Sequence, residues 1–372
     1  MTTKSWGDIQ VPTLPPAAPR APQTVRDPGR PSASRIRVAA THLGATDLAG
    51  FATTPCEGRI PRSELPHIMT FLEEVQSWRN STEIPSVAEA EVYCATLART
   101  HYENFPVVSW LLPGRLHQHF YNVYAFCRWA DDLGDEVGDP ALALELLNWW
   151  RGELSDCYAG RVRHPVFVAL QQTIQQFTIP TEPFTDLISA FEQDQTVREY
   201  ETFDQLLDYC RRSANPVGRL VLRLGECDTP QNVAWSDSIC TGLQLANFWQ
   251  DVARDAAIGR TYLPQEDRHR YGVTDEILRL RRSTPEFTTL MRFEVDRTRE
   301  FLQAGRPLVG AVPSWLQVEI DLFLHGGLQI IREIETIRYR VWEVRPRVSK
   351  WAIARLFVRS LIRWAQRRLW GS

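Results

Sequence analysis

Two short rows of polar side chains restrict the fold of this chain more than any other feature of its sequence. The first row has one arginine and three aspartates at positions i, i+3, i+4 and i+7: Arg128, Asp131, Asp132 and Asp135. The second row follows more than a hundred residues later with the spacing 0, +3, +7 and +11: Gln244, Asn247, Asp251 and Asp255. On a helix each row forms one polar face, and both rows lie among apolar and aromatic residues, where an uncompensated charge is costly. We therefore expect the two helices to meet around a positive group.

The chemistry of the rows predicts a divalent metal ion. A single i, i+4 pair of aspartates is more often a solvated helix face, so the argument depends on the presence of two rows. Oxygen ligands without histidine or cysteine partners select Mg²⁺, with Mn²⁺ as the alternative, and Mg²⁺ commonly completes its coordination with water and substrate phosphates. The implied substrate carries a diphosphate. His117 and His119 face opposite sides of a helix, so we assign them no metal.

Composition narrows the class of protein. With 372 residues, of which 44% are hydrophobic and 23% charged, the chain has an ordinary globular composition that excludes wholesale disorder and a disulfide scaffold. The formal net charge of −3 provides no basic field, so we expect no nucleic-acid partner. Seven widely spaced cysteines without a CxxC pair indicate reduced thiols in the cytoplasm. No apolar run approaches the roughly 18 residues of a bilayer span, so we expect neither a secreted nor an integral membrane protein.

Proline content separates the first part of the chain from the rest. Nine of the 24 prolines precede residue 62, and we expect residues 1–62 to form a disordered extension. Residues 63–345 are long enough for a single domain. Their apolar periodicity predicts a helix over about 87–100, a second that runs to about Gly134 and a third that Gly259 closes. Strand signals are scarce, so the sequence predicts an all-α fold.

The C-terminal segment 346–372 differs from the rest of the chain in charge. From Arg345 onward there are eight Lys or Arg residues and no acidic residue. A helix here would carry arginines four residues apart beside apolar side chains: Arg355, Arg359, Arg363, Arg367, Ile353, Phe357, Leu361 and Trp364. Two interpretations stay open. The segment is either a basic amphipathic helix that lies on a membrane surface, or a terminal helix docked on an acidic surface of its own domain.

The segments that carry the two rows resemble the two aspartate-rich signatures of the squalene and phytoene synthases. They read YAFCRWADDLGDE at 124–136 and QLANFWQDVARDAAIGRTYLP at 244–264. The resemblance extends over about residues 84–335 and implies the isoprenoid-synthase helical bundle, as a single catalytic domain. Three further segments look most like the bacterial hydroxysqualene synthases of hopanoid biosynthesis: HYENFPVVSWLLP at 101–113, FEQDQ at 191–195 and YCRRSANPVGRLVL at 209–222.

The resemblance implies roles for the polar residues of both rows. The ligands of a magnesium cluster on the diphosphate would be Asp131, Asp135, Asn247, Asp251 and Asp255, with Asp132 in support. The substrate phosphates would be bound or oriented by Arg128, Gln244, Arg260 and Tyr262. The expected catalytic residues are Asp131, Asp135, Asp251, Asp255 and Tyr124. Mg²⁺ and guanidinium groups would neutralise the charge that develops as the C–O bond of the leaving group breaks.

A carbocation formed by such an ionisation needs an apolar, aromatic pocket that excludes most water. Candidate wall residues are Phe105, Tyr124, Phe191 and Tyr209, for which plain core packing is the alternative. Candidates for holding a water molecule are Asn104, Asn215 and Gln195, for which a helix cap or a buried hydrogen bond is the alternative. His101 could help bind diphosphate or have a structural role.

The function that the resemblance implies is the Mg²⁺-dependent conversion of presqualene diphosphate and water into hydroxysqualene and diphosphate, without NADPH. We expect a cytoplasmic enzyme at the membrane periphery, supplied with presqualene diphosphate by a partner enzyme. The alternatives are head-to-head condensation of two prenyl diphosphates to presqualene diphosphate, squalene or phytoene; an isoprenoid cyclase; and a non-catalytic scaffold or assembly protein. The proline in SANPVG at 213–218 argues against ordinary condensation, the 101–113 segment gives a cyclase no support, and the intact rows argue against a scaffold.

Overall fold

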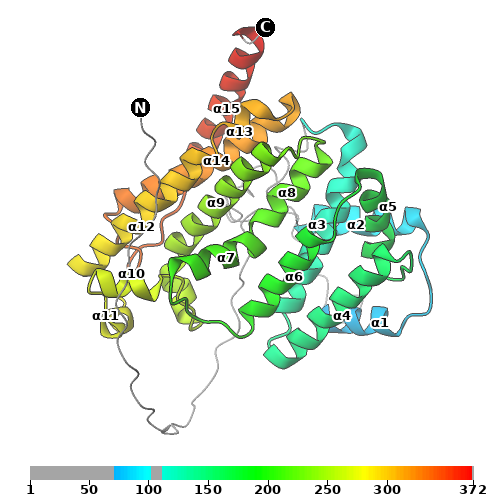
Figure 1. The fold of residues 1–372 in the computed structure, drawn as a ribbon, viewed down its shortest axis with the longest axis horizontal. Helices are drawn as coiled ribbons and strands as arrows, with labels where there is room; N and C mark the ends of the chain where they lie inside the picture. The colour runs from blue at the N-terminus through cyan, green and yellow to red at the C-terminus, as the bar shows by residue number, and fades with distance from the viewer. Residues whose placement is uncertain (1–70, 102–110, 371–372) are drawn as a thin grey trace, which may run out of the picture. The chain divides into compact units, whose positions relative to one another are not determined.

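The structure is a computed structural model that describes residues 71–101 and 111–370. Within these ranges the chain is helical and contains no strand, with one isolated β-bridge between Glu199 and Thr261. The prediction of an all-α fold is confirmed (Figure 1). The predicted extension 1–62 lies outside the described residues, as do Asn104, Phe105 and the side chain of His101.

The helices of the described ranges are named in chain order. They are α1 Phe71–Asn80, α2 Val87–His101, α3 Gly114–Asp135, α4 Pro140–Tyr158, α5 Pro165–Phe177, α6 Glu182–Asp194, α7 Phe203–Ser213, α8 Asn215–Leu224, α9 Pro230–Ala257, α10 Gln265–Arg270, α11 Asp275–Leu280, α12 Pro285–Ala304, α13 Leu308–Ala311, α14 Ser314–Thr336 and α15 Lys350–Trp370.

The three helices predicted from apolar periodicity are confirmed as α2, α3 and α9. Helix α2 begins with a capping box, in which the Ser86 amide donates to Glu89 Oε2 at 2.8 Å and the Glu89 amide donates to Ser86 Oγ at 3.3 Å. Helix α9 begins after Thr229, whose hydroxyl accepts from the Asn232 amide. It ends at Ala257, and Gly259 follows at φ +75°, a conformation that glycine adopts without strain.

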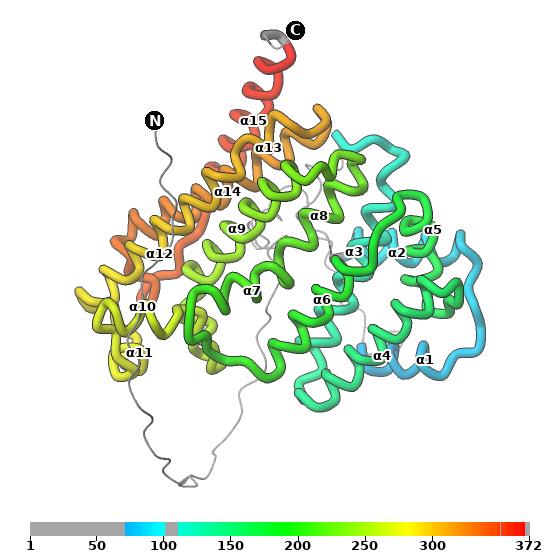
Figure 2. Tube along the Cα trace, viewed as in Figure 1, coloured from blue at the N-terminus to red at the C-terminus, as the bar shows by residue number. Residues whose placement is uncertain are grey.

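Two apolar clusters hold the helices in place. In one cluster α3 packs against α2, α4, α5 and α6, with Trp129 and Trp150 stacked at its centre, their ring centroids 5.3 Å apart. In the other, α9 packs against α8, α12 and α14 (Figure 2). Trp249 and Phe287, both fully buried, belong to this cluster. Each of the two helices that carry a polar row is therefore fixed by its own apolar face, which leaves the polar face for the space between the clusters.

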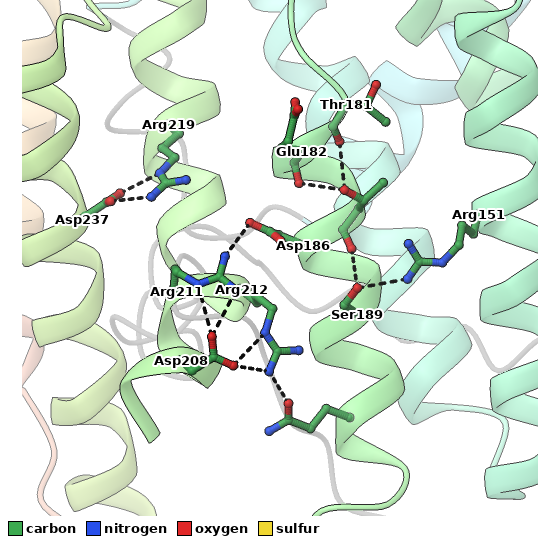
Figure 3. A network of polar contacts seen from close by, with 12 residues as sticks. Arg151, Thr181, Glu182, Asp186, Ser189, Asp208, Arg211, Arg212, Arg219 and Asp237 are labelled. Carbon is green, nitrogen blue, oxygen red and sulfur yellow. Dashed lines mark hydrogen bonds and ion pairs between the residues drawn. The ribbon is translucent and has the colours of Figure 1, made fainter. Parts of the chain in front are cut away.

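Ion pairs connect the middle helices from outside the cores (Figure 3). Arg219 of α8 donates two hydrogen bonds to Asp237 of α9, at 3.0 and 2.6 Å. Arg211 of α7 donates to Asp186 of α6 at 3.3 Å and to Asp208 of its own helix at 3.1 Å. Pairs this exposed contribute little stability singly, but the two-bond geometry of Arg219 sets the orientation of α8 on α9.

Helix α15 docks on α14 through one of its faces. Asp321 of α14, almost fully buried, accepts hydrogen bonds from Ser360 and from Arg363, whose Nε lies 3.2 Å from Oδ1. Trp364 Nε1 donates to the Ser314 carbonyl at 2.8 Å. The structure thus shows this helix docked on an acidic group of its own domain through part of its surface. The opposite face stays exposed, and Trp351 is 86% accessible there.

Close contact between α9 and the end of α12 depends on a glycine. A Cβ atom on Gly305 would lie 2.4 Å from Ile239 Cγ1 and 2.5 Å from the Trp235 carbonyl oxygen, so no side chain fits. At Gly310 in α13, by contrast, a Cβ atom would meet no heavy atom within 4 Å. The first glycine therefore permits a helix contact, whereas the second occupies open space.

We predict that Gly305→Ala lowers the free energy of unfolding by about 1–3 kcal/mol, because the backbone carbonyl of Trp235 cannot move away cheaply. Gly310→Ala serves as the matched control and is expected to be neutral or slightly stabilising, by about 0.5 kcal/mol. Urea unfolding of the two variants measures the difference. Equal midpoints for the two variants would show that the contact at Gly305 is not tight.

Candidate active site

A cavity of about 1210 Å³, including its open mouth, lies among α3, α8, α9, α13 and α14. Its walls are mostly apolar and include Phe120, Val123, Val221, Ile239, Leu243 and Phe323. Tyr124, Arg128 and Asp131 of the first polar row and its preceding turn also line the cavity. The space therefore combines a mostly apolar interior with a polar region supplied by α3.

The first row is organised around Arg128. Its guanidinium forms a two-bond ion pair with Asp132, with Nε 2.8 Å from Oδ2, and its Nη1 lies 3.8 Å from Asp131 Oδ2. Asp131 is 8% exposed, and its Oδ1 has no hydrogen-bond partner. Burial, reinforced by the carboxylate of Asp135, raises the pKa of Asp131 well above its ordinary value. The row thus contains more buried negative charge than Arg128 compensates.

The second row also has unsatisfied oxygens. Gln244 is 4% exposed, and neither its Oε1 nor the Oδ1 of Asn247 has a hydrogen-bond partner. Burial and the carboxylate of Asp251 together raise the pKa of Asp255 to about 8. Buried amide and carboxylate oxygens without donors are unusual in folded proteins, and these oxygens are the kind that bind hard cations.

The two rows approach each other at Asp194, the last residue of α6. Asp194 is 4% exposed and interacts electrostatically with Asp131 of the first row and with Asp255 of the second. Its backbone carbonyl accepts from Arg260 Nη2 at 2.8 Å, and its carboxylate accepts from the Tyr209 hydroxyl at 2.9 Å. Sequence reasoning missed Asp194, although it lies inside the FEQDQ segment at 191–195. Its spacing relates it to neither row, so no periodic signal identifies it.

Arg260 and Tyr262 extend the polar region beyond the end of α9. Burial alone would lower the pKa of the Arg260 guanidinium, but Asp194, two tyrosines and Asp135 raise it. Arg260 lies in the loop that follows α9. Its guanidinium therefore connects this loop with the carboxylate of Asp135 in the first row. Tyr262 stacks on Phe248, with ring centroids 3.8 Å apart, and its buried hydroxyl has no partner. Both residues are held rigidly while polar atoms remain available.

Asp251 has a different environment from the one that the sequence predicts. Both carboxylate oxygens accept from Arg345, with Nε 2.5 Å from Oδ1 and Nη2 3.1 Å from Oδ2. Arg345 follows α14 and was counted only as the first charge of the basic segment. A metal ion at Asp251 would therefore have to share this carboxylate with Arg345 or displace the guanidinium. No spacing rule links positions 94 residues apart, so this pair was inaccessible to sequence reasoning.

Other predicted residues lie elsewhere. Gln195 Nε2 donates to the Gly134 and Phe191 carbonyls, each at 3.1 Å, and Asn215 Oδ1 accepts from Thr241. Neither side chain is among those that line the cavity. Phe191 and Tyr209 are buried in the apolar clusters, Phe191 beside Gly134 and Tyr209 beside Phe248. The ring nitrogens of His117 and His119 interact with the Leu112 carbonyl and the Thr173 hydroxyl.

The described part of the chain contains no complete metal-binding cluster. No three of its His, Cys, Asp or Glu side chains come together closely enough to hold an ion unaided. Mg²⁺ typically takes one or two carboxylates and completes its shell with water and phosphate oxygens. The unpartnered oxygens of Asp131, Asn247 and Gln244 suit ions shared between the protein and a diphosphate, so the donor set fits such a group.

A helical bundle in which one acidic helix face lines an apolar cavity, with a second acidic face linked to the first through Asp194, has the architecture of an isoprenoid synthase. A family model described as squalene/phytoene synthase matches residues 98–352, well over half of the chain. The chain belongs to this family.

Individual relatives agree with this assignment. A phytoene synthase of Arthrospira platensis is 30% identical over 69% of this chain and 88% of its own. A hydroxysqualene synthase of Rhodopseudomonas palustris is 34% identical over 64% of this chain and 82% of its own. The crystal structure of squalene synthase HpnC from Alicyclobacillus acidocaldarius aligns with a TM-score of 0.65 and 42% identity, over 68% of this chain and 96% of that one.

We predict that Arg345→Met lowers the free energy of unfolding by about 3 kcal/mol, because it removes both hydrogen bonds to the buried carboxylate of Asp251 and leaves it only Arg254, at 3.8 Å. In a double-mutant cycle with Asp251→Asn, we expect a coupling energy of about 1–3 kcal/mol. The neighbouring Arg347 is exposed, so Arg347→Met is the matched control and should change stability by no more than about 0.5 kcal/mol. Additive effects of the two single substitutions would contradict the pairing of Arg345 with Asp251.

Proposed function

We propose that this protein is a hydroxysqualene synthase, which ionises presqualene diphosphate and adds water to give hydroxysqualene and diphosphate. The observation that carries the proposal is one apolar cavity whose wall includes Arg128 and the carboxylate of Asp131, which has an unpartnered oxygen. A C30 chain suits the apolar interior, and a diphosphate suits the polar region. The 34% identity to a hydroxysqualene synthase supports the choice within the family.

The protein's own residues would assist ionisation mainly by electrostatics. Arg128 is held in position by Asp132, and Arg260 is held by the Asp194 carbonyl, so both guanidinium groups are oriented before substrate binds. Such preorganised charge stabilises a leaving group as it becomes negative. Tyr124 lines the cavity one turn before Arg128 and would position the reacting end of the substrate.

Magnesium would complete this site. Its proposed ligands are Asp131, Asp135, Asn247, Asp251 and Asp255, with Asp132 supporting Arg128, and Mn²⁺ is the alternative ion. When bound, the ion would neutralise charge on the diphosphate oxygens. The raised pKa values of Asp131 and Asp255 are consistent with carboxylates whose burial and mutual repulsion outweigh the neighbouring arginines. The reaction transfers no electrons, so the proposal requires no NADPH, and it requires another enzyme to supply presqualene diphosphate.

Head-to-head condensation of two prenyl diphosphates is the second candidate. Two relatives favour condensation, because one is named a phytoene synthase and the other a squalene synthase. A condensing enzyme would consume farnesyl or geranylgeranyl diphosphate without added presqualene diphosphate, which separates the two candidates directly.

We predict that the purified protein with Mg²⁺ converts presqualene diphosphate into hydroxysqualene equally well with and without NADPH, and leaves farnesyl diphosphate unchanged. Asp131→Asn should lower the rate by about a hundredfold or more, because it removes buried charge from the polar region. Asp204→Asn, at an exposed position in the first turn of α7, is the control and should retain the wild-type rate. Product analysis by chromatography and mass spectrometry measures both. Consumption of farnesyl diphosphate alone would identify a condensing enzyme instead.

The exposed face of α15 supports a proposal of peripheral membrane contact in the cytoplasm. Within the described residues, no helix has the length and apolarity needed to cross a bilayer. The face of α15 that points away from α14 exposes Trp351, Val358 and Ile362 beside Arg355 and Arg359. Apolar side chains next to cations are typical of helices that lie on anionic lipid surfaces.

We predict that replacing both Arg355 and Arg359 by Gln weakens binding to vesicles containing anionic lipid by about tenfold or more, since each cation near such a surface contributes about 1 kcal/mol. Arg282→Gln removes an exposed charge from a different part of the chain and should leave binding unchanged. Vesicle flotation measures the bound fraction. Point substitutions are preferable to deletion of α15, because deletion would leave the buried carboxylate of Asp321 without Arg363. Equal flotation of all three proteins would contradict the proposal.

A further inference from the structure

Glu319 of α14 is a buried carboxyl group in the wall of the large cavity. Its side chain is 3% exposed, and its Oε2 has no hydrogen-bond partner. It lines the same space as Tyr124 and Arg128, yet it belongs to neither polar row. Sequence reasoning gave it no role, because a single glutamate in an apolar helix carries no spacing signal.

Two other buried carboxyl groups, on α12 and α14, have an arginine partner, whereas Glu319 has none. Glu294 of α12 pairs with Arg297 at 2.6 Å, and Asp321, only two residues from Glu319, pairs with Arg363 of α15. The two-residue offset places Asp321 toward α15 and Glu319 toward the cavity. Glu319 forms no ion pair with the described residues. Burial alone raises its pKa to about 8. A buried acid without a cation is costly to stability and suggests a role in binding.

A carboxyl group in the wall of a mostly apolar cavity is a site for a water molecule. An ordered buried water needs two to four polar partners and space of its own size, and the cavity is large enough. Ile320 and Phe323 of its own helix are apolar, whereas Tyr124, Arg128 and Ser236 are further polar residues of the same lining. Water inside the cavity would therefore bind at these few polar groups, of which Glu319 is the one supplied by α14.

We propose that Glu319 positions the water molecule that captures the carbocation, and so determines that the product is an alcohol. This inference rests on the proposed function, because it assumes that presqualene diphosphate is ionised in this cavity. At neutral pH the carboxyl group is mostly protonated, since burial raises its pKa to about 8. A neutral carboxyl group can donate to and accept from a water molecule while being a much poorer nucleophile toward a cation than a carboxylate.

The C–O bond to the diphosphate breaks and its electron pair leaves with the diphosphate. The water oxygen then forms a new C–O bond to the cationic carbon, and the water loses one proton. The net acceptor of this proton is the released diphosphate, so Glu319 is unchanged at the end of the cycle. Without a positioned water, the cation would lose a proton from carbon and give a C30 hydrocarbon.

The test compares diphosphate release with the identity of the C30 product from presqualene diphosphate. Glu319→Leu removes both oxygens, and we expect diphosphate release near the wild-type rate while the ratio of hydroxysqualene to hydrocarbon falls about tenfold or more, the effect of losing one strong hydrogen bond. Glu319→Gln retains two polar atoms and should restore most of the alcohol. Gln329→Leu, a buried polar residue of the same helix outside the cavity lining, is the control and should keep the wild-type ratio.

The outcomes separate the inference from the proposed function. An unchanged product ratio in Glu319→Leu would overturn the role of Glu319, as would loss of diphosphate release in a variant that remains folded by circular dichroism. If wild-type protein releases no diphosphate from presqualene diphosphate, the proposed function fails and this inference fails with it. Leucine in place of an unpaired buried acid should not prevent folding, and Glu319→Met provides the same test with a more flexible side chain.

Discussion

Repulsion among buried carboxylates is the interaction on which this architecture depends. Asp194 of α6 interacts both with Asp131 of the first row and with Asp255 of the second, so carboxylates from three helices meet where the rows approach. Because like charges repel one another, other interactions must hold these helices together. The apolar clusters around Trp129 and Trp249 do so, since they pack against the opposite faces of α3 and α9. Buried like charges that weaken the fold are typical of binding sites rather than of stabilising networks.

Arginines partly compensate this charge, and each is anchored differently. Arg128 is fixed within its own helix by Asp132, whereas Arg260 is fixed by the backbone of α6, and Arg345 reaches Asp251 from the segment after α14. The result is a polar region that is rigid but electrostatically incomplete, because oxygens of Asp131, Asn247 and Gln244 remain without donors. A diphosphate accompanied by divalent cations would supply what is missing, with negative charge for the arginines and positive charge for the carboxylates.

The parts of this arrangement that follow local periodicity could be predicted from the sequence. Helical spacing identifies the two rows, and local signals place the C-terminal ends of α2, α3 and α9 within a few residues of the observed ones. Residues whose importance comes from tertiary contact could not be found in this way. Asp194 lies between the rows only because α6 ends beside α3. Arg345 binds Asp251 although the two residues are 94 positions apart in the sequence. Glu319 was missed for a related reason, since only the packed structure shows that its helix face borders a cavity.

Helix α14 connects the chemistry to the surface of the molecule. One face contributes Glu319, Ile320 and Phe323 to the cavity wall, and another binds α15 through Asp321. A peripheral enzyme that takes a water-insoluble chain from a bilayer gains from placing its membrane contact next to the wall of its apolar cavity, because the substrate then crosses little water. The exposed apolar and basic face of α15 lies one helix away from that wall. The proposed membrane contact and the proposed site of water capture are therefore carried by two helices packed directly against each other.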